Sequence, residues 1–390
     1  MNAPQSPGQL PAKPPIFSGI SGLKALAGAE KGGVWLRPLD LFAGGAAEAA
    51  IAAGTALPLA GSGLAFACIE VLARLPQGGA AGAAVTIAEF NSWKETGTGF
   101  DLADRLAGRL DALTRPRPDW AGFDLKQPLL MGIVNVTPDS FSDGGAFLAA
   151  EQAIAQGRAL LEAGAHILDI GGESTRPGAT PVAPEEEISR VEPVIRALAE
   201  AGAVISIDTR HARVMEAAIA AGARIINDVS ALSGDPDSLG TASRLGVPVV
   251  LMHMPGDPQT MQQNPSYELA SLDVAEYLAR RIDLCAGAGI PAERIVVDPG
   301  IGFGKLSAHN LEILARLALL HGLGCGVLLG VSRKSLIGEL DAGAPPKDRL
   351  PGSLAAALFG LGQGVQILRV HDIAETRQAV AVWRGITQGA

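Results

Sequence analysis

Eight short apolar segments, separated by amphipathic stretches, constrain the fold of this chain more than any other feature. They lie at 129–135, 166–171, 203–208, 224–228, 247–252, 294–298, 326–330 and 365–370. Between them apolar residues recur with a helical period, for example in Glu151–Ala163, Pro184–Glu200 and His211–Ala221. Strand–helix units repeated over 129–390 predict a (β/α)8 TIM barrel, which typically needs about 250 residues. An open doubly wound sheet is the alternative, but it rarely repeats the unit so evenly.

Residues 1–125 have a different pattern and predict a smaller N-terminal α/β extension, with the barrel taking 126–390. Residues 1–15 are rich in Pro and Gln and are expected to be disordered. TRPRPDW, at Thr114–Trp120, marks a boundary because its two prolines interrupt a helix. We find no chemical motif before it, so a folding, oligomerisation or docking role, a decayed fusion partner and a second activity all stay open. The expected elements are strands at Gly33–Leu41, Leu64–Ile69 and Ala84–Phe90 and a helix at Leu102–Leu113.

The composition indicates a globular protein with a large core and an acidic barrel. Apolar residues make up 48% of the chain, and charged residues 18%. Residues 1–125 hold ten basic and eleven acidic residues, so nearly all of the net charge of −9 belongs to the barrel. A field of this sign does not attract nucleic acid, and we expect no nucleic-acid partner. An anionic substrate would need local cations and backbone amides.

The expected location is the cytoplasm. The cysteines, Cys68, Cys285 and Cys325, are far apart and show neither a disulfide framework nor zinc spacing. The first residues lack the basic and apolar regions of a signal peptide. Ala49–Ile69 is uncharged and long enough to cross a bilayer, but small residues dominate it and Pro58 interrupts it. We therefore expect buried elements of a small domain there, and no membrane partner.

Polar residues gather where the predicted strands end, which is where TIM barrels carry their chemistry. Helix capping predicts one or two polar residues at each end, and not the density of Asp, Asn, Arg, Lys and His seen here. The strand ends read NVTPDS, DIGGESTRPG, SIDTR, INDVS, LMHM, DPGIGFGK, GVSRKS and RVHD.

This ordered set resembles the dihydropteroate synthase family of folate biosynthesis over nearly all of Leu129–Ala390. NVTPDSFSDGG, GGESTRPG and SRKS are specific signatures, and DPGIGFGK and RVHD support them in the right order. A lone GIGFG would be weak support. The resemblance implies that 4-aminobenzoate displaces pyrophosphate from 6-hydroxymethyl-7,8-dihydropterin pyrophosphate, giving 7,8-dihydropteroate. It also implies a homodimer formed through barrel helices.

The resemblance assigns the pterin to residues at several strand ends. A pterin presents ring nitrogens and an exocyclic amine, which buried acceptors and a few donors can bind. Asp208, Asn227 and Asp298 match acceptors of the family, Lys334 adds a donor and counts as catalytic, and Met252 would pack on the ring. The alternatives are that Asp208 caps the next helix, that Asp298 stabilises a turn, and that Met252 is ordinary core.

The leaving diphosphate needs cations, amides and, by resemblance, Mg²⁺. Asn135 is the implied metal ligand, and it contacts the diphosphate together with Thr175, Arg369 and His371. Arg369 and His371 also count as catalytic because they would stabilise the leaving charge. Asn135 is neutral, so substrate oxygens and water must complete the Mg²⁺ shell. The alternative for His371 is a helix-start residue.

Two long connections, Val136–Leu148 and Gly172–Ala183, suggest lids over the substrates. In the family these loops help to form the aminobenzoate site, and sulfonamide mimics of aminobenzoate should then inhibit. The aromatic residues could instead be core, and His166, His211, His309 and His321 show no metal-ligand pairing in the sequence. The residues that would line this site are Phe141, Thr175, Arg176, Pro177, Phe303, Lys334 and Ser335.

Two rival functions share this barrel. A methyltetrahydrofolate–corrinoid methyltransferase would share the pterin-binding Asp and Asn residues but would not need the pyrophosphate and loop signatures. A non-catalytic pterin-binding regulator should have lost some of the residues named above, and Asn135, Arg176, Lys334, Arg369 and His371 are all present. The motifs contain no nucleophile–base pair, so catalysis would rest on positioning and charge stabilisation.

Overall fold

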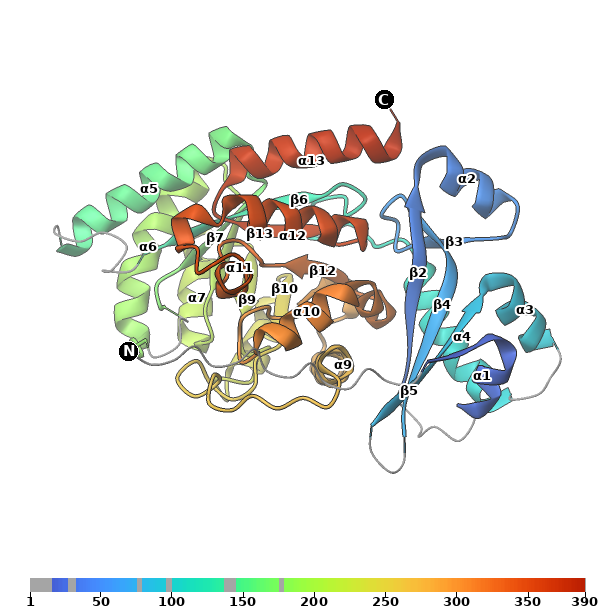
Figure 1. The fold of residues 1–390 in the computed structure, drawn as a ribbon. Helices are drawn as coiled ribbons and strands as arrows, with labels where there is room; N and C mark the ends of the chain where they lie inside the picture. The colour runs from blue at the N-terminus through green and yellow to red at the C-terminus, as the bar shows by residue number, and fades with distance from the viewer. Residues whose placement is uncertain are drawn as a thin grey trace.

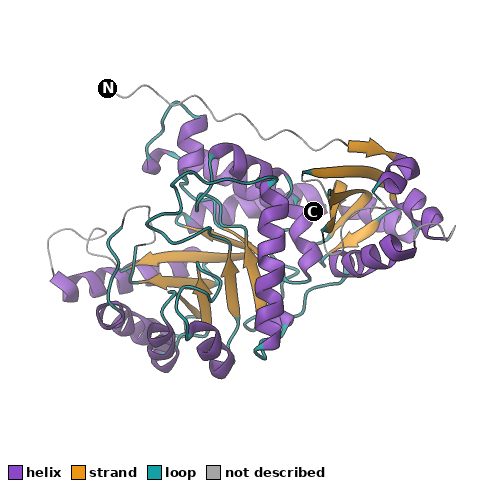
Figure 2. Cartoon of the chain, turned by 90° about the horizontal axis from the view of Figure 1, so that it is seen from below, coloured by secondary structure: helices purple, strands orange, loops and turns teal. Residues whose placement is uncertain are grey.

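The computed structural model describes residues 16–26, 33–75, 79–95, 100–136, 145–174 and 179–389. The expected disordered segment 1–15 lies outside these residues. A closed barrel and a separate sheet lie side by side, as Figures 1 and 2 show from two directions.

The predicted TIM barrel is confirmed, and each strand coincides with one of the eight apolar segments. All neighbouring strands run parallel and the sheet closes on itself, with β13 paired to β6. The strands read as continuous apolar runs because both of their faces are buried. They are β6 (Leu129–Asn135), β7 (Ile167–Gly171), β8 (Ile205–Asp208), β9 (Ile225–Asp228), β10 (Val249–Met252), β11 (Ile295–Asp298), β12 (Gly326–Leu329) and β13 (Ile367–Val370).

Helices surround the strands (Figure 2). Local sequence explains their ends: Pro184 opens α6 in front of three glutamates, and Gly222 ends α7 with a φ of 119°. The helices are α5 (Gly145–Ala163), α6 (Pro184–Glu200), α7 (Ala212–Ala221), α8 (Ser238–Leu245), α9 (Ala270–Gly287), α10 (Ser307–Ala315), α11 (Ser335–Leu340), α12 (Leu350–Gly362) and α13 (Ile373–Gln388), with short 3-10 turns η2 (Ala292–Arg294), η3 (Leu317–Leu323) and η4 (Pro346–Asp348).

The N-terminal region is an α/β unit, as expected. Its sheet has the order β1-β5-β4-β2, and β3 pairs with β4. Its strands are β1 (Ile16–Ser18), β2 (Val34–Ala43), β3 (Leu57–Leu59), β4 (Leu64–Arg74) and β5 (Ala80–Thr86), and its helices are α1 (Gly19–Ala25), α2 (Gly44–Ala52), α3 (Ile87–Glu95) and α4 (Phe100–Thr114).

One expected strand of this region, Ala84–Phe90, is wrong in its second half. Strand β5 stops at Thr86, and α3 begins at Ile87. A capping box causes the switch: the Glu89 amide donates to Thr86 Oγ1 at 3.1 Å, and the Thr86 amide donates to the Glu89 carboxylate at 2.8 Å.

The uncharged stretch Ala49–Ile69 holds the end of α2, strand β3 and the start of β4. Among the described residues, no helix is both long and apolar enough to cross a bilayer.

The N-terminal unit docks on the α9–η3 side of the barrel through arginines. Arg74 pairs with three acidic side chains at the start of α9, those of Glu268, Asp273 and Glu276. The guanidinium of Arg109, on α4, stacks 3.7 Å from the centre of the buried Trp35 ring and also donates to the Gly322 carbonyl.

The segment after α4 closes the amino-terminal mouth of the barrel. Trp120 and Leu125 are buried in one cluster with barrel residues such as Leu129 and Ile225. The Trp120 indole donates to the Arg294 carbonyl at 3.0 Å. Both residues therefore pack beneath the barrel, on the N-terminal side of the division that we predicted at residue 125.

Candidate active site

The carboxyl ends of the strands enclose one pocket, and all five residues assigned to the pterin line it. Asp208 ends β8, Asn227 lies on β9, and Met252 and Asp298 are register partners at the ends of β10 and β11. The full lining is Asp208, Asn227, Val229, Met252, Asp298, Gly300, Ile301, Phe303, Gly330, Lys334 and Arg369.

A buried charge network forms one wall of this pocket. Arg369 donates from Nε to Asp169 Oδ2 at 2.6 Å and from Nη2 to Asp208 Oδ2 at 2.7 Å. Asn227 Nδ2 donates to the same Asp169 oxygen at 3.0 Å. The Asp208 side chain is therefore committed to Arg369 and does not cap α7.

Asp169 is a member of the network that we did not predict. It lies in the middle of β7, within ILDIG, and is completely buried. A carboxylate inside a fully buried strand is rare without a partner, so the sequence did contain a signal.

The network perturbs the ionisation of its members. Burial raises the pKa of Asp208, Arg369 opposes the shift, and Asp169 adds to it. Burial alone would lower the pKa of Arg369, but the two carboxylates that face its guanidinium raise it. One guanidinium therefore serves two carboxylates, and a ligand that offers N–H donors to Asp208 would stabilise its ionised form.

Lys334 and Phe303 form another wall. Burial and repulsion by Arg369 lower the pKa of Lys334 to about 8, although Asp298 and Asp208 oppose the shift. Its ammonium lies 4.2 Å from the centre of the Phe303 ring. Phe303 is thus part of the pocket surface, although it also packs against a small cluster that contains Met252.

Burial raises the pKa of Asp298, another lining residue. Its Oδ1 accepts the Gly300 amide at 2.7 Å, so Asp298 also stabilises the turn after β11.

A buried lysine fixes the loop after β11. The ammonium of Lys305 donates to the carbonyls of His253, Gly300 and Phe303 at 2.9 to 3.1 Å, and its fourth contact is His253 Nδ1 at 2.9 Å. Gly300 has a φ of 67°, and a Cβ there would lie 2.0 Å from the His253 carbonyl oxygen. The hydrogen bonds of Lys305 hold the loop that carries Phe303. We did not predict this role of Lys305, because the motif alone does not show the direction of its side chain.

Of the residues assigned to the diphosphate, Asn135, Arg369 and His371 lie at the ends of β6 and β13. Asn135 is the last residue of β6 and is partly buried. His371 precedes α13, and its Nδ1 lies 3.0 Å from the Ser332 hydroxyl. Burial, Arg333 and Arg369 lower the pKa of His371 to about 4, so its imidazole is neutral at pH 7.

The structure brings together only part of the predicted aminobenzoate site. Phe303 and Lys334 line the pocket, whereas Ser335 is the exposed first residue of α11 and does not. Phe141, Thr175, Arg176 and Pro177 lie outside the described residues, as do most of the first predicted lid and the middle of the second.

Known proteins match about two thirds of this chain. A family model described as "Pterin binding enzyme" matches residues 131–371. The dihydropteroate synthase of Escherichia coli K12 is 48% identical over 260 residues, which are 66% of this chain and 92% of that protein. A Yersinia pestis dihydropteroate synthase structure with a sulfonamide drug complex is 45% identical, with a TM-score of 0.65, over 68% of this chain and 96% of that one. A Xanthomonas albilineans dihydropteroate synthase structure in complex with 7,8-dihydropteroate is 47% identical, with a TM-score of 0.63, over 70% and 98%.

The closed barrel, its pocket of buried carboxylates and the family match define a pterin-binding enzyme. Within that class the synthase signatures and the relatives agree, and they favour a transferase over the methyltransferase and the non-catalytic regulator. The chain belongs to the dihydropteroate synthases.

Proposed function

We propose that this chain condenses 6-hydroxymethyl-7,8-dihydropterin pyrophosphate with 4-aminobenzoate, giving 7,8-dihydropteroate and pyrophosphate. The observation that carries the proposal is one pocket that is lined by the Arg369 network, with Asp208 and Asn227, and by Asp298 and Lys334. Carboxylates accept from the pterin N–H groups, and the amide and the ammonium bind its acceptors.

Catalysis in this pocket rests on position and charge. The bond from the pterin methylene carbon to the diphosphate oxygen breaks, and pyrophosphate departs with the bonding electrons. The dihydropterin ring stabilises the resulting cation, the arylamine nitrogen then bonds to the methylene carbon, and that nitrogen loses a proton. Arg369 and His371 would stabilise the leaving charge, and Lys334 with Phe303 would shape the side from which the aryl ring approaches.

The donor set at the end of β6 fits a Mg²⁺ ion that arrives with the substrate. Asn135 offers one neutral amide oxygen, whereas one oxygen of Asp169 is taken up by Arg369 and Asn227. Mg²⁺ commonly keeps several waters and binds through few protein oxygens plus substrate phosphates. When bound by Asn135 and the diphosphate, the ion would neutralise charge on the leaving group.

Asn135→Ala should raise the Mg²⁺ concentration needed for half-maximal activity by about tenfold, which corresponds to roughly 1.4 kcal/mol. The reason is the loss of one oxygen ligand. Asn135→Asp adds a negative charge and should lower that concentration. An unchanged Mg²⁺ titration in both variants would remove Asn135 from the metal site.

The pH dependence of kcat/KM should show a basic limb near the pKa of Lys334, about 8 in the free enzyme. Lysine is charged below its pKa, so activity should fall as the pH rises through this value. In Lys334→Arg the cation stays charged, and the limb should move beyond pH 10 even if overall activity drops. A limb that stays near pH 8 in this variant would assign it to another group.

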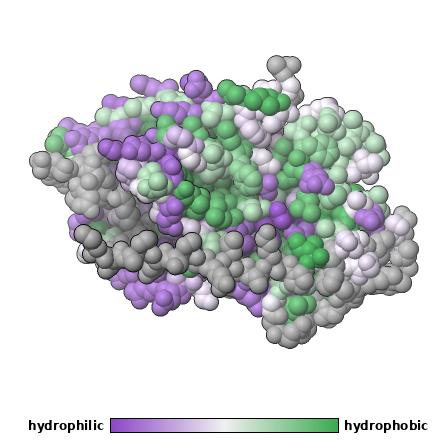
Figure 3. Space-filling view, viewed as in Figure 1, coloured by the Kyte–Doolittle hydropathy of each residue, from purple (hydrophilic) through white to green (hydrophobic). Residues whose placement is uncertain are grey.

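The assembly and the location are further parts of the proposal. Val382 and Ile386 lie one turn apart on α13, Phe359 lies on α12, and all three side chains are exposed. Apolar side chains gather along the α13 edge of the molecule (Figure 3), which suits a second copy of the chain. Free Cys68, Cys285 and Cys325 support a cytoplasmic location.

One assay tests the function: pyrophosphate release from purified protein with the pterin substrate, 4-aminobenzoate and Mg²⁺. Release should require 4-aminobenzoate, and sulfonamides should compete with it. Pyrophosphate release that is independent of 4-aminobenzoate, or no release at all, would contradict the proposal.

A further inference from the structure

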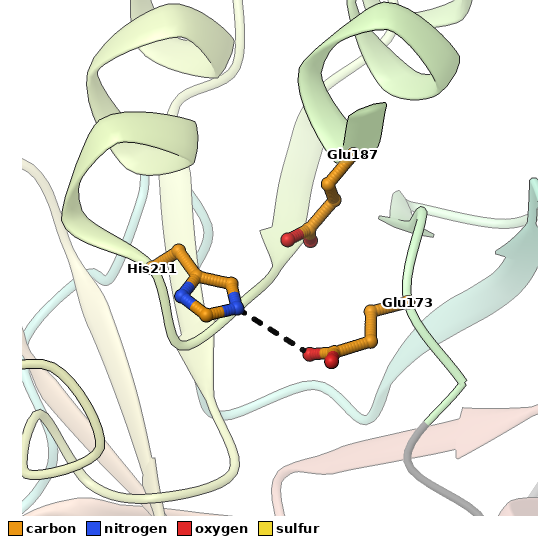
Figure 4. Close-up of side chains that lie close together, drawn as sticks. All are labelled: Glu173, Glu187 and His211. Carbon is orange, nitrogen blue, oxygen red and sulfur yellow. Dashed lines mark ion pairs between the residues drawn. The ribbon is translucent and has the colours of Figure 1, made fainter. Parts of the chain in front are cut away.

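A second cluster of ionisable side chains lies behind the wall of the pocket. Glu173 follows β7, Glu187 lies in the first turn of α6, and His211 is the residue before α7. One ligand atom from each lies within 4.8 Å of the other two, and His211 Nε2 is 3.7 Å from Glu173 Oε2. Figure 4 shows the three side chains pointing toward one another from separate elements. None of the three lines the pterin pocket.

Three of the buried atoms that converge in this cluster, two on Glu187 and one on His211, lack hydrogen-bond partners among the described residues. Glu187 is completely buried, and neither of its carboxylate oxygens makes a hydrogen bond with the described residues. Burial raises the pKa of Glu187, and the nearby Thr209 side chain opposes this shift. His211 Nε2 is also buried and has no hydrogen bond within the described part of the chain. Buried polar atoms without a partner are unfavourable and rare, so three such atoms in one place indicate a missing ligand.

We propose that Glu173, Glu187 and His211 bind a divalent transition-metal ion such as Zn²⁺, at a structural site separate from the substrate pocket. An imidazole with two carboxylates is a donor set for first-row transition metals, whereas Mg²⁺ prefers oxygen ligands alone. Ligand atoms on one Zn²⁺ lie about 3.5 Å apart, so the 3.7 Å pair is nearly in place and Glu187 must move inward. Water would fill the remaining positions. The ion would tie together the end of β7, the start of α6 and the start of α7.

Arg210 would compete with this ion for the Glu173 carboxylate. It donates to Glu173 from Nε at 3.1 Å and from Nη2 at 3.0 Å, while the Val182 amide also donates to Glu173. Glu187 lies near enough to interact with the charge of this guanidinium, but it does not pair with it. Metal binding must therefore draw one Glu173 oxygen away from Arg210, and removal of the guanidinium should tighten it.

The test is direct metal binding to the full-length protein without substrates. Titration with Co²⁺, followed by its visible absorption, and equilibrium dialysis with Zn²⁺ should both show about one ion per chain. Glu187→Gln and His211→Asn should each weaken binding by about tenfold or more. Circular dichroism confirms that each variant is folded.

Matched variants make the result specific. Glu185→Gln removes an exposed acid from the same turn of α6, and Asn135→Ala alters the proposed Mg²⁺ ligand, so both should leave Co²⁺ binding unchanged. Arg210→Gln should bind more tightly than the unmodified protein. No bound ion, or binding that Glu187→Gln and His211→Asn leave unaltered, would overturn the proposal and assign the cluster to a buried water.

Discussion

Replacing Arg369 with methionine should lower kcat by at least about 10²–10³-fold, the largest effect expected from one substitution in the pocket. Methionine keeps much of the volume of the side chain but removes the cation that Asp169 and Asp208 share. The two buried carboxylates would then face each other, and at least one must take up a proton. Pterin binding to Asp208 and stabilisation of the leaving diphosphate would both be lost. Steady-state pyrophosphate release measures the effect.

The same substitution should lower the free energy of unfolding by about 3–5 kcal/mol, because it leaves buried charge without a partner. Adding Asp169→Asn removes one of the two carboxylates and should restore part of the stability, as measured by urea unfolding. It should not restore turnover, which separates catalysis from folding. Arg196→Met, at an exposed pair with Glu192, is the control and should change both quantities little. Recovery of kcat in the double variant would show that Arg369 acts only through folding.

The barrel was predictable because its pattern is local. Parallel strands buried on both faces appear as apolar runs, and the topology brings their carboxyl ends together whatever the details of packing. Asp208, Asn227, Met252, Asp298 and Lys334 could therefore be assigned to one pocket before any distance was known, and the structure places them there.

What could not be predicted depends on distances between residues remote in the sequence. Lys305 contacts three carbonyls and a histidine nitrogen, although its motif is compatible with a lysine that faces the substrate. No metal-ligand pairing for His211 is visible in the sequence, because Glu173 and Glu187 reach it only through the packing of α6 and α7. By contrast, the capping box at Thr86–Glu89 is visible in the sequence, although the expected strand Ala84–Phe90 ran past it.

Trp120→Ala should lower the free energy of unfolding by about 3–5 kcal/mol, although Trp120 lies outside the family match. The indole is almost fully buried beneath the barrel, where it packs in one cluster with side chains of β6, β7, β9 and β10 and is fixed by the Arg294 carbonyl. Its removal leaves a cavity and an unpaired carbonyl at the amino-terminal mouth. The pocket lies at the opposite ends of the strands, so the KM values of the folded variant should stay unchanged. Urea unfolding and steady-state kinetics measure the two effects.

The control for this prediction is Trp383→Ala, which removes the same side chain from a partly exposed position on α13 and should cost clearly less. Two truncations then distinguish the contribution of the segment after α4 from that of the N-terminal unit. Both remove the docked sheet, but deletion of 1–114 keeps Trp120 and Leu125 while deletion of 1–125 removes them. If the segment after α4 is an integral part of the barrel, the longer deletion should be less stable by an amount similar to Trp120→Ala. Equal stability of the two truncations would instead make the segment a passive linker, with the N-terminal unit contributing only through its docked face.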